Sequence, residues 1–404
     1  MKHLQVTVPS IFLIITLVGF PQISETIYSP ALPDIVTALK TTDELVQWTL
    51  SIYFLGFALG VFFWGRLSDH FGRRPTMLLG IIIYGLSSLA CFLSNSIEWL
   101  LCYRFFQAFG ASVGSVVTQT IMRESFEGKD RQKLFSAIGI ALSLTPALGP
   151  FIGGYINEWF DWRANFTVLV ILSVLIFFYT LFRLPETRTK QPPSVVKSPI
   201  KLFEVGLRLL KDKRVLGSTW LIAAVNGILF SYYAEAPFIF IEIIGISPSQ
   251  YGWLGVFIGS AAMLGSVISH RLSGRLSTDE LILLGCKVMI VSALVLCFFT
   301  TFNFVSSHNI FISILCVMLP MGGIVLGSFG LLTPAVLSTA LKHYTAVLGT
   351  AGAWFGLAYY VLIAALTWLM GVLHNGTPIP MSVYFLVLSL SSLVTYYYLI
   401  KEKP

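Results

Sequence analysis

The fold is decided by the stretch Trp64-Gly-Arg-Leu-Ser-Asp-His-Phe-Gly-Arg-Arg-Pro75. It joins two apolar runs, residues 44–64 and 75–93, and each run, as a helix, is long enough to cross a hydrocarbon layer of about 30 Å. The two runs and their link therefore predict a transmembrane hairpin. Positive charge collects in short loops on the inner face of a membrane, so the three arginines of the link place it in the cytoplasm.

The composition agrees with a protein that crosses the membrane many times. Of its 404 residues, 56% are hydrophobic and 11% are charged, and the mean hydropathy is +0.81. A soluble core does not need so large an apolar fraction. The net charge of +7 comes from short loop clusters and not from a basic stripe with interleaved aromatic residues, so we expect no nucleic-acid partner.

The sequence offers no pattern that indicates a catalytic or metal site. Its five cysteines lie inside apolar segments without metal-ligand spacing, and it has no Cys/His/Asp set and no Gly-x-Gly-x-x-Gly loop. We therefore expect free thiols, no metal, no cofactor and no enzymatic activity. The first apolar run, about residues 8–27, contains Gln22 and Glu25 and lacks a small-residue cleavage site, which predicts a retained helix and not a signal peptide.

The distribution of apolar spans predicts an all-α membrane protein with twelve transmembrane helices. One long polar stretch, residues 185–214, separates the sixth span from the seventh, and we expect a cytoplasmic linker there with an amphipathic helix on the membrane surface. The flanking parts, 1–184 and 215–404, are nearly equal in length, as two six-helix bundles would be. The spans lie near residues 8–28, 44–65, 75–94, 98–122, 133–157, 164–184, 215–238, 249–271, 280–302, 308–336, 346–371 and 381–400.

The positions of the basic residues predict the orientation in the membrane. With both termini in the cytoplasm, all but four of the 26 Lys and Arg residues lie in or beside inner segments. The exceptions are Lys40 and Arg163 in outer links and Arg104 and Lys287 within spans. This asymmetry favours two cytoplasmic termini.

Charged residues inside the spans are the first candidates for function. Each one costs about 2.5–3.5 kcal/mol to insert, so it needs a partner or a watery cavity. Glu25 in the first span and Arg104 in the fourth lie at similar depth, where an ion pair or a shared water cavity would satisfy both. The alternatives are that Glu25 reaches the outer headgroups and that Arg104 forms a structural salt bridge.

Glu25 is our first candidate for a proton carrier. Burial favours a neutral carboxyl and a nearby cation favours a charged one, so protonation can depend on which side of the protein is open. Glu235 in the seventh span is the second candidate, and its late position in that helix predicts a place nearer the outer surface.

Polar and aromatic residues in the first, fourth, seventh and eleventh spans are candidates for a substrate cavity. Such side chains suit amphipathic ligands, which need stacking and few fixed contacts. The candidates are Gln22, Thr26, Tyr28, Gln107, Asn226, Tyr232, Tyr233 and Tyr359.

Two elements resemble motifs of a known family. The pattern Gly65-x-Leu-x-Asp69-x-x-Gly72-Arg73-Arg74 resembles the loop between the second and third helices of the major facilitator superfamily, and this resemblance implies a role in conformational change. Arg104-x-x-Gln107-x-x-Gly110 resembles an element in the fourth helix of that superfamily's drug exporters, where the arginine is associated with proton transfer.

The fifth predicted span ends in Gly149-Pro150-x-x-Gly153-Gly154. Its small residues alone indicate close contact between helices, and its prolines indicate a bend. The ending also resembles the antiporter signature in the fifth helix of exporters, which favours export over uptake.

The densest resemblance is to the Bcr/CflA group of drug-resistance transporters, twelve-helix drug:proton antiporters. It is carried by residues 27–35, 162–166 and 236–238, which read Ile-Tyr-Ser-Pro-Ala-Leu-Pro-Asp-Ile, Trp-Arg-Ala-Asn-Phe and Ala-Pro-Phe. That group usually has Thr-Asp-Met-Tyr where this chain has Glu25-Thr26-Ile27-Tyr28, so the acid stands one position earlier. A shift of one residue turns a side chain by about 100° around the helix axis, so Glu25 points in a different direction from the aspartate of that group.

The resemblance implies a proton-coupled antiporter that exports small amphipathic drugs or toxic compounds by alternating access. Its partners would be the solute, protons and the lipid bilayer, and it would act as a monomer in the plasma membrane, which is the inner membrane if the source is a Gram-negative bacterium. The alternative is the export of an endogenous metabolite such as a siderophore, sugar or amino-acid derivative.

Overall fold

A computed structural model describes residues 9–126, 147–188, 199–306, 308–344 and 347–401. All regular structure within these ranges is helical. The first part of the chain forms α1 (Ile11–Thr26), η1 (Ser29–Ala31), α2 (Leu32–Leu39), α3 (Asp43–Phe71), α4 (Arg73–Phe92), α5 (Ile97–Ser125), a helix over residues 147–159, and α7 (Trp162–Arg183).

The second part begins with α8 (Pro199–Leu209), which occupies the linker between the two predicted bundles. It continues with α9 (Lys213–Pro237), η2 (Phe238–Ile243), α10 (Pro248–Leu272), α11 (Thr278–Thr301), α12 (Ile310–Val325), η3 (Leu326–Leu332), α13 (Thr333–Thr339), α14 (Leu348–Leu373), α15 (Ile379–Thr395) and η5 (Tyr396–Ile400).

Eleven segments among the described residues are long and apolar enough to cross a membrane. The predicted all-α membrane fold is therefore confirmed. Of the expected fifth span, 133–157, residues 133–146 lie outside the described ranges, while 147–157 are helical. The total of twelve helices and the cytoplasmic termini remain predictions.

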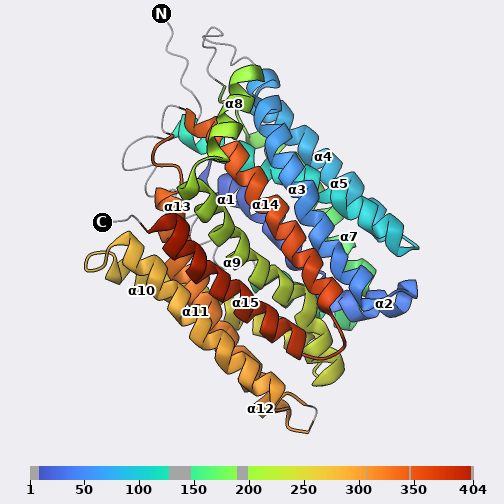
Figure 1. The fold of residues 1–404 in the computed structure, drawn as a ribbon. Helices are drawn as coiled ribbons and strands as arrows, with labels where there is room; N and C mark the ends of the chain where they lie inside the picture. Colours follow the sequence, from blue (N-terminus) through green and yellow to red (C-terminus); the bar gives the residue numbers. More distant parts are fainter. Residues whose placement is uncertain (1–8, 127–146, 189–198, 307, 345–346, 402–404) are drawn as a thin grey trace, which may run out of the picture.

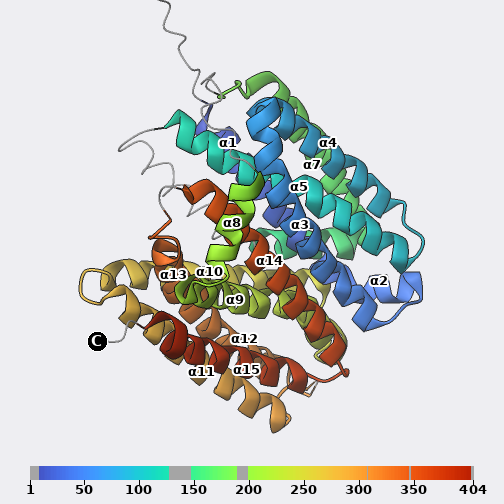
Figure 2. The same cartoon turned by 45° about the horizontal axis from the view of Figure 1, so that its top comes forward.

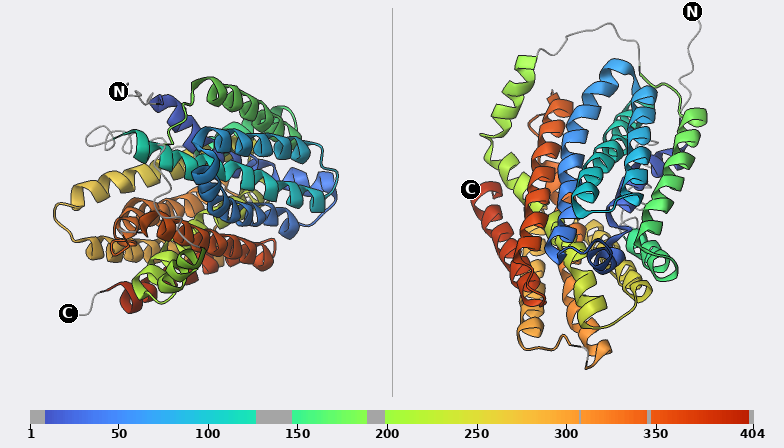
Figure 3. Two further views of the ribbon diagram at one scale, coloured as in Figure 1. Left: turned by 90° about the horizontal axis from the view of Figure 1, so that it is seen from above. Right: turned by 90° about the vertical axis from the view of Figure 1, so that its right-hand side faces the viewer.

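The helices form two neighbouring groups. Helices α1 to α7 lie on one side of the molecule and α9 to α15 on the other, with α3 and α14 packed together at the junction (Figures 1 and 2). The same division is visible from above in Figure 3. The packing of α3 against α14 matters for function, because a movement of one helix group relative to the other would change this contact.

The outer helices present apolar side chains where a bilayer would cover them. On α7, Ile171, Leu175, Phe178 and Phe182 are all exposed, and their spacing places them on one face of the helix. Contact with lipid accounts for this face, since exposure to water would be unfavourable.

Candidate functional site

Arg104 is a fully buried cation held between two aromatic rings. Its guanidinium carbon lies 4.2 Å from the ring centre of Tyr28 and 4.3 Å from that of Tyr53. Its Nη1 donates to Gln107 Oε1 at 2.5 Å, one turn further along α5, and to the backbone oxygen of Ser24 at 3.3 Å. The two ring faces and these oxygens therefore stabilise the charge.

Glu25 lies in the last turn of α1 and is only 7% exposed. Among the described residues it forms no ion pair with Arg104 within 4.0 Å and no side-chain hydrogen bond, so the structure does not show the first of the two expected arrangements, a direct ion pair. The guanidinium lies over the rings of Tyr28 and Tyr53 instead. The carboxyl still lies within electrostatic range of Arg104.

The surroundings of Glu25 place it at the junction of the two helix groups. Its charge reaches the hydroxyl groups of Tyr53 on α3 and of Tyr359 and Tyr360 on α14. Tyr360 also contacts Phe57 of α3, with ring centres 4.8 Å apart and ring planes tilted by 50°. Glu25 is thus directed into the protein and not toward the outer headgroups.

Several buried polar atoms around Arg104 have no hydrogen-bond partner among the described residues. They are Nε and Nη2 of Arg104, the Ser24 hydroxyl on α1 and the Tyr84 hydroxyl on α4. Buried polar groups in proteins are normally satisfied, often by ordered water. Water or a polar group of a ligand beside Arg104 would satisfy these atoms.

The predicted cavity residues divide between this region and the second helix group. Gln107 also donates to Ser88 at 2.8 Å, and the Tyr28 hydroxyl bonds Thr49 at 2.8 Å. The Thr26 hydroxyl donates to the backbone oxygen of Gln22 at 3.2 Å, and Gln22 Oε1 is buried without a partner among the described residues. Tyr28 and Gln107 thus contact Arg104, and Tyr359 lies within electrostatic range of Glu25.

The three predicted cavity residues of α9, Asn226, Tyr232 and Tyr233, have contacts away from Glu25 and Arg104. The Tyr232 hydroxyl donates to the sulfur of Met318 on α12 at 3.3 Å, and Asn226 donates to the Ile222 oxygen of its own helix at 2.8 Å. Tyr233 is buried beside η1, where its backbone oxygen accepts a hydrogen bond from Ser29 at 2.6 Å. These three side chains are not brought to Glu25 and Arg104 by any described contact.

Glu235 belongs to a second, separate cluster. Its side chain is only 1% exposed, so Glu235 is buried inside the protein, although it lies in the last turn of α9, toward the end that charge predicts to be outside. Gln47 Nε2 donates to Glu235 Oε2 at 2.7 Å, and His374 Nδ1 lies 2.9 Å from both carboxylate oxygens. His374 Nε2 lies 3.1 Å from Asp43 Oδ2. The sequence analysis did not identify Asp43, Gln47 or His374.

The predicted conformational loop is held by acidic residues from distant parts of the chain. Arg73 donates to Glu124 at 2.6 Å and 3.1 Å and to Asp69 at 2.9 Å. Glu186 accepts from the backbone nitrogens of Arg73 and Arg74 at 2.9 Å and 3.1 Å, and so caps the start of α4. Gly72, with φ +102°, makes the turn between α3 and α4, a conformation that favours glycine, while Gly65 lies one turn before Asp69.

The helix over residues 147–159 packs against both groups of helices. A Cβ at Gly149 would meet the Thr26 hydroxyl, and one at Gly153 would collide with the backbone oxygen of Ile27. On another face, Gly154 packs on the backbone of Pro248, and Gly252 of α10 packs on the backbone oxygen of Pro150. The glycines thus permit close backbone contact, as their pattern predicted.

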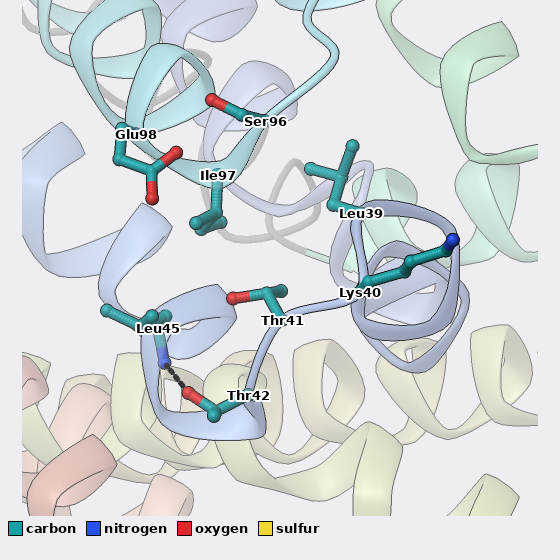
Figure 4. Close-up of a pocket in the computed structure, with 8 residues that line it drawn as sticks. All are labelled: Leu39, Lys40, Thr41, Thr42, Leu45, Ser96, Ile97 and Glu98. Atoms are coloured by element: carbon teal, nitrogen blue, oxygen red, sulfur yellow. Dashed lines mark hydrogen bonds between the residues drawn. The ribbon is translucent and has the colours of Figure 1, made fainter.

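Two hollows lie near the predicted outer ends of the helices. One, of about 450 Å³, lies between the link from α2 to α3 and the start of α5 and includes Lys40 and Glu98 (Figure 4). In its wall, Thr42 caps α3 by accepting from the Leu45 nitrogen at 3.3 Å. The other, of about 20 Å³, is lined by Asp43, Glu235 and His374. Neither is lined by Glu25 or Arg104.

The helical architecture and the buried charges define a polytopic membrane transporter. The family model of the Major Facilitator Superfamily matches residues 14–397, and the chain belongs to that superfamily. It resembles the crystal structure of a D-xylose-proton symporter with a TM-score of 0.78 at 15% identity, over 96% of this chain and 97% of that one. This likeness concerns the fold.

Relatives narrow the assignment to a branch of the superfamily. The chain is 36% identical to an uncharacterized transporter of Rickettsia bellii (strain RML369-C), over 96% of each protein. It is 25% identical to a bicyclomycin resistance protein homolog of Haemophilus influenzae, over 94% of this chain and 93% of that protein. The relatives agree with the predicted Bcr/CflA drug-resistance branch. The protein is a transporter of small molecules and not an enzyme, with multiple spans in the plasma membrane.

Proposed function

We propose that the protein is a proton-coupled antiporter that exports small amphipathic drugs or toxic compounds by alternating access. The observation that carries this proposal is the buried Glu25 carboxyl at the junction of the two helix groups, near Arg104 but not paired with it. The name of the Haemophilus influenzae relative supports drugs as the solute class.

In this proposal Glu25 takes up a proton on one side of the membrane and releases it on the other. The charged carboxylate is attracted by Arg104, and the neutral acid is not, so protonation changes which arrangement of α1, α3 and α14 is favoured. A drug bound among Tyr28, Gln107 and Tyr359 would compete with the proton on Glu25. One charge moving down the membrane potential supplies about 2.3 kcal/mol per 100 mV.

The remaining parts of the chain have supporting roles in the proposal. Two six-helix bundles, residues 1–184 and 215–404, rock against each other, and the linker 185–214 and both termini lie in the cytoplasm. The network of Arg73, Glu124 and Glu186 keeps the inner ends of α3, α4 and α5 together during this movement. The protein acts as a monomer.

Everted membrane vesicles test the proposal, because their lumen corresponds to the outside of the cell. With an acidic lumen, the protein should concentrate radiolabelled chloramphenicol inside the vesicles, and the lumen should become alkaline as the drug enters. Drug uptake without proton movement would exclude antiport. Uptake of neither chloramphenicol nor any other compound of a drug panel would exclude drug export.

The same vesicles separate drug export from export of a metabolite. The relative of 36% identity is named only as a transporter, so its name does not distinguish the two solute classes. Siderophores, sugars and amino-acid derivatives should not compete with chloramphenicol if drugs are the solutes. Complete competition by one metabolite would favour the alternative.

Arg104→Ala should inactivate transport. The substitution removes the cation that both rings contact, leaves Gln107 Oε1 without its donor and removes the charge that attracts Glu25. Arg104→Lys keeps the charge but loses the planar stacking, so it should retain part of the rate. The measurement is the initial uptake rate against lumenal pH in both variants, and an ordinary pH-dependent rate in Arg104→Ala would refute the role of Arg104.

A further inference from the structure

The cluster of Asp43, Gln47, Glu235 and His374, here called the outer cluster, joins the two helix groups at the end that charge predicts to be outside. Asp43 and Gln47 lie in the first turns of α3, Glu235 lies in the last turn of α9, and His374 follows α14. No described contact connects the cluster with Glu25 or Arg104, so the proposed coupling site does not account for it.

The geometry of His374 favours a protonated ring when both neighbouring carboxyl groups are charged. One ring nitrogen faces the Glu235 carboxylate at 2.9 Å and the other faces the Asp43 carboxylate at 3.1 Å. A neutral imidazole has one donor nitrogen and one acceptor nitrogen, so one carboxylate would face a lone pair. The imidazolium donates from both nitrogens and satisfies both carboxylates.

The electrostatic surroundings agree with a charged ring. Burial alone lowers the pKa of His374, but the hydrogen bond to Glu235 and the charges of Glu235 and Asp43 outweigh burial and hold that pKa above its ordinary value. Glu242 of η2 lines the same small hollow and adds a third carboxylate. Asp34 of α2 lies within range of Glu242, and it accepts a hydrogen bond from Asn157 at 2.5 Å.

Opening of the outer end would break only part of the cluster. The contacts of Asp43 with His374 and of Gln47 with Glu235 cross between the helix groups, whereas Glu235 and His374 both belong to the second group. Ser29 with Tyr233 and Glu158 with Ser249 also join the groups here, so this end is closed in the structure. After opening, His374 would face one fewer carboxylate and would bind its proton less tightly.

We propose that the outer cluster is a proton-binding latch, in which uptake of a proton by His374 from the outside closes the outer end of the transporter and loss of that proton releases it. The Asp43 side chain is 34% exposed and the neighbouring His374 side chain is 9% exposed, so the cluster lies at the protein surface. The latch rests on alternating access from the proposed function. Its proton returns to the outside, so it is distinct from the proton that Glu25 would carry across.

The direction of the pH dependence follows from linkage. The closed state has the higher pKa for His374, so closure is favoured by protonation. This contribution is fully present below the pKa that His374 has in the open state, where Glu235 still faces the ring but Asp43 does not. It is lost as the pH rises through the higher pKa of the closed state.

Distance measurements between spin labels at Ala38→Cys on α2 and Ile379→Cys on α15 test the latch without any transport assay. Both positions are exposed, and each belongs to a different helix group. The labels are placed in the full chain with Cys102→Ser, since Cys102 is an exposed thiol, and with Glu25→Gln, which removes the coupling proton. The protein is measured in lipid nanodiscs.

Between about pH 5.5 and about pH 8.5, on either side of the ordinary histidine pKa, the ratio of short to long distances should fall several-fold. His374→Gln should lower that ratio by about tenfold at the acidic pH, because a charge-assisted hydrogen bond is lost, and should remove its pH dependence. His308→Gln is the matched control, since this exposed histidine lies in another outer link, and it should leave the response unchanged.

A second pair of variants covers the case in which His374→Gln does not fold. Gln47→Glu places a carboxylate against Glu235 and should open the outer end. Gln47→Glu with Glu235→Gln restores a donor and an acceptor between the helix groups and should close the outer end again, with a weaker pH response because His374 then faces an amide in place of the Glu235 carboxylate. A pH response that persists in His374→Gln, or an outer end that stays closed in Gln47→Glu, would overturn the latch. Because the coupling acid is already removed, these outcomes do not depend on whether the protein exports drugs.

Discussion

Glu25→Gln should abolish proton-driven export while the protein stays folded. Glutamine has the shape of a protonated glutamate, but it cannot bind or release a proton. The solute would then receive no energy from the membrane potential. At 100 mV this energy is about 2.3 kcal/mol per charge, which corresponds to a solute gradient of about fifty-fold.

The fold should tolerate this substitution because the carboxyl makes no described hydrogen bond or ion pair that would be lost. Removing an unpaired buried acid should not lower the melting temperature, and the loss of transport would then be a loss of coupling. Uptake of chloramphenicol and alkalinisation of the lumen are measured together in everted vesicles. Glu98→Gln, at an exposed carboxyl near the start of α5, is the matched control and should behave as the wild type. Unchanged accumulation in Glu25→Gln would remove this residue from the mechanism.

The membrane architecture could be predicted because the bilayer acts on each segment separately. A run of about 20 apolar residues must form a helix across the hydrocarbon, whatever its neighbours are. The turn at Gly72 and the basic residues after it were evident for the same local reason. The partners of Arg73 were not evident from the sequence, since Glu124 is 51 residues away and Glu186 is 113 residues away. Such contacts depend on how the helices pack.

The candidate site shows the same limit. Arg104 and Gln107 are neighbours because three residues make about one helical turn, and this spacing was visible in the sequence. Whether Glu25 and Arg104 form an ion pair could not be decided from the sequence, because depth along a helix does not determine rotation about its axis. The outer cluster could not be predicted, since Asp43 and His374 are 331 residues apart and each stands near a helix end, where polar residues are common.

Gly153→Ala should push the helix over residues 147–159 away from the end of α1. Among substitutions of glycine by alanine in this helix, it should lower the stability most. The new Cβ would overlap the backbone oxygen of Ile27, which cannot move without the rest of α1. Overpacking of this kind costs about 1–3 kcal/mol or more. Because Ile27 precedes Tyr28, the displacement would also pull that ring from Arg104, so molecules that fold should transport poorly.

The prediction is specific because a Cβ at each of the other glycines would meet different atoms or none. Gly149→Ala meets the Thr26 hydroxyl, a side-chain atom that can rotate, so it should lower the melting temperature less than Gly153→Ala. Gly349→Ala and Gly352→Ala on α14 meet nothing within 4 Å, and alanine favours a helix by about 0.5–1 kcal/mol over glycine, so these variants should match or exceed the wild type. Melting temperatures in detergent and uptake rates in vesicles rank the four variants. If Gly153→Ala were as stable and active as Gly349→Ala, the close contact between residue 153 and α1 would not exist in the working protein.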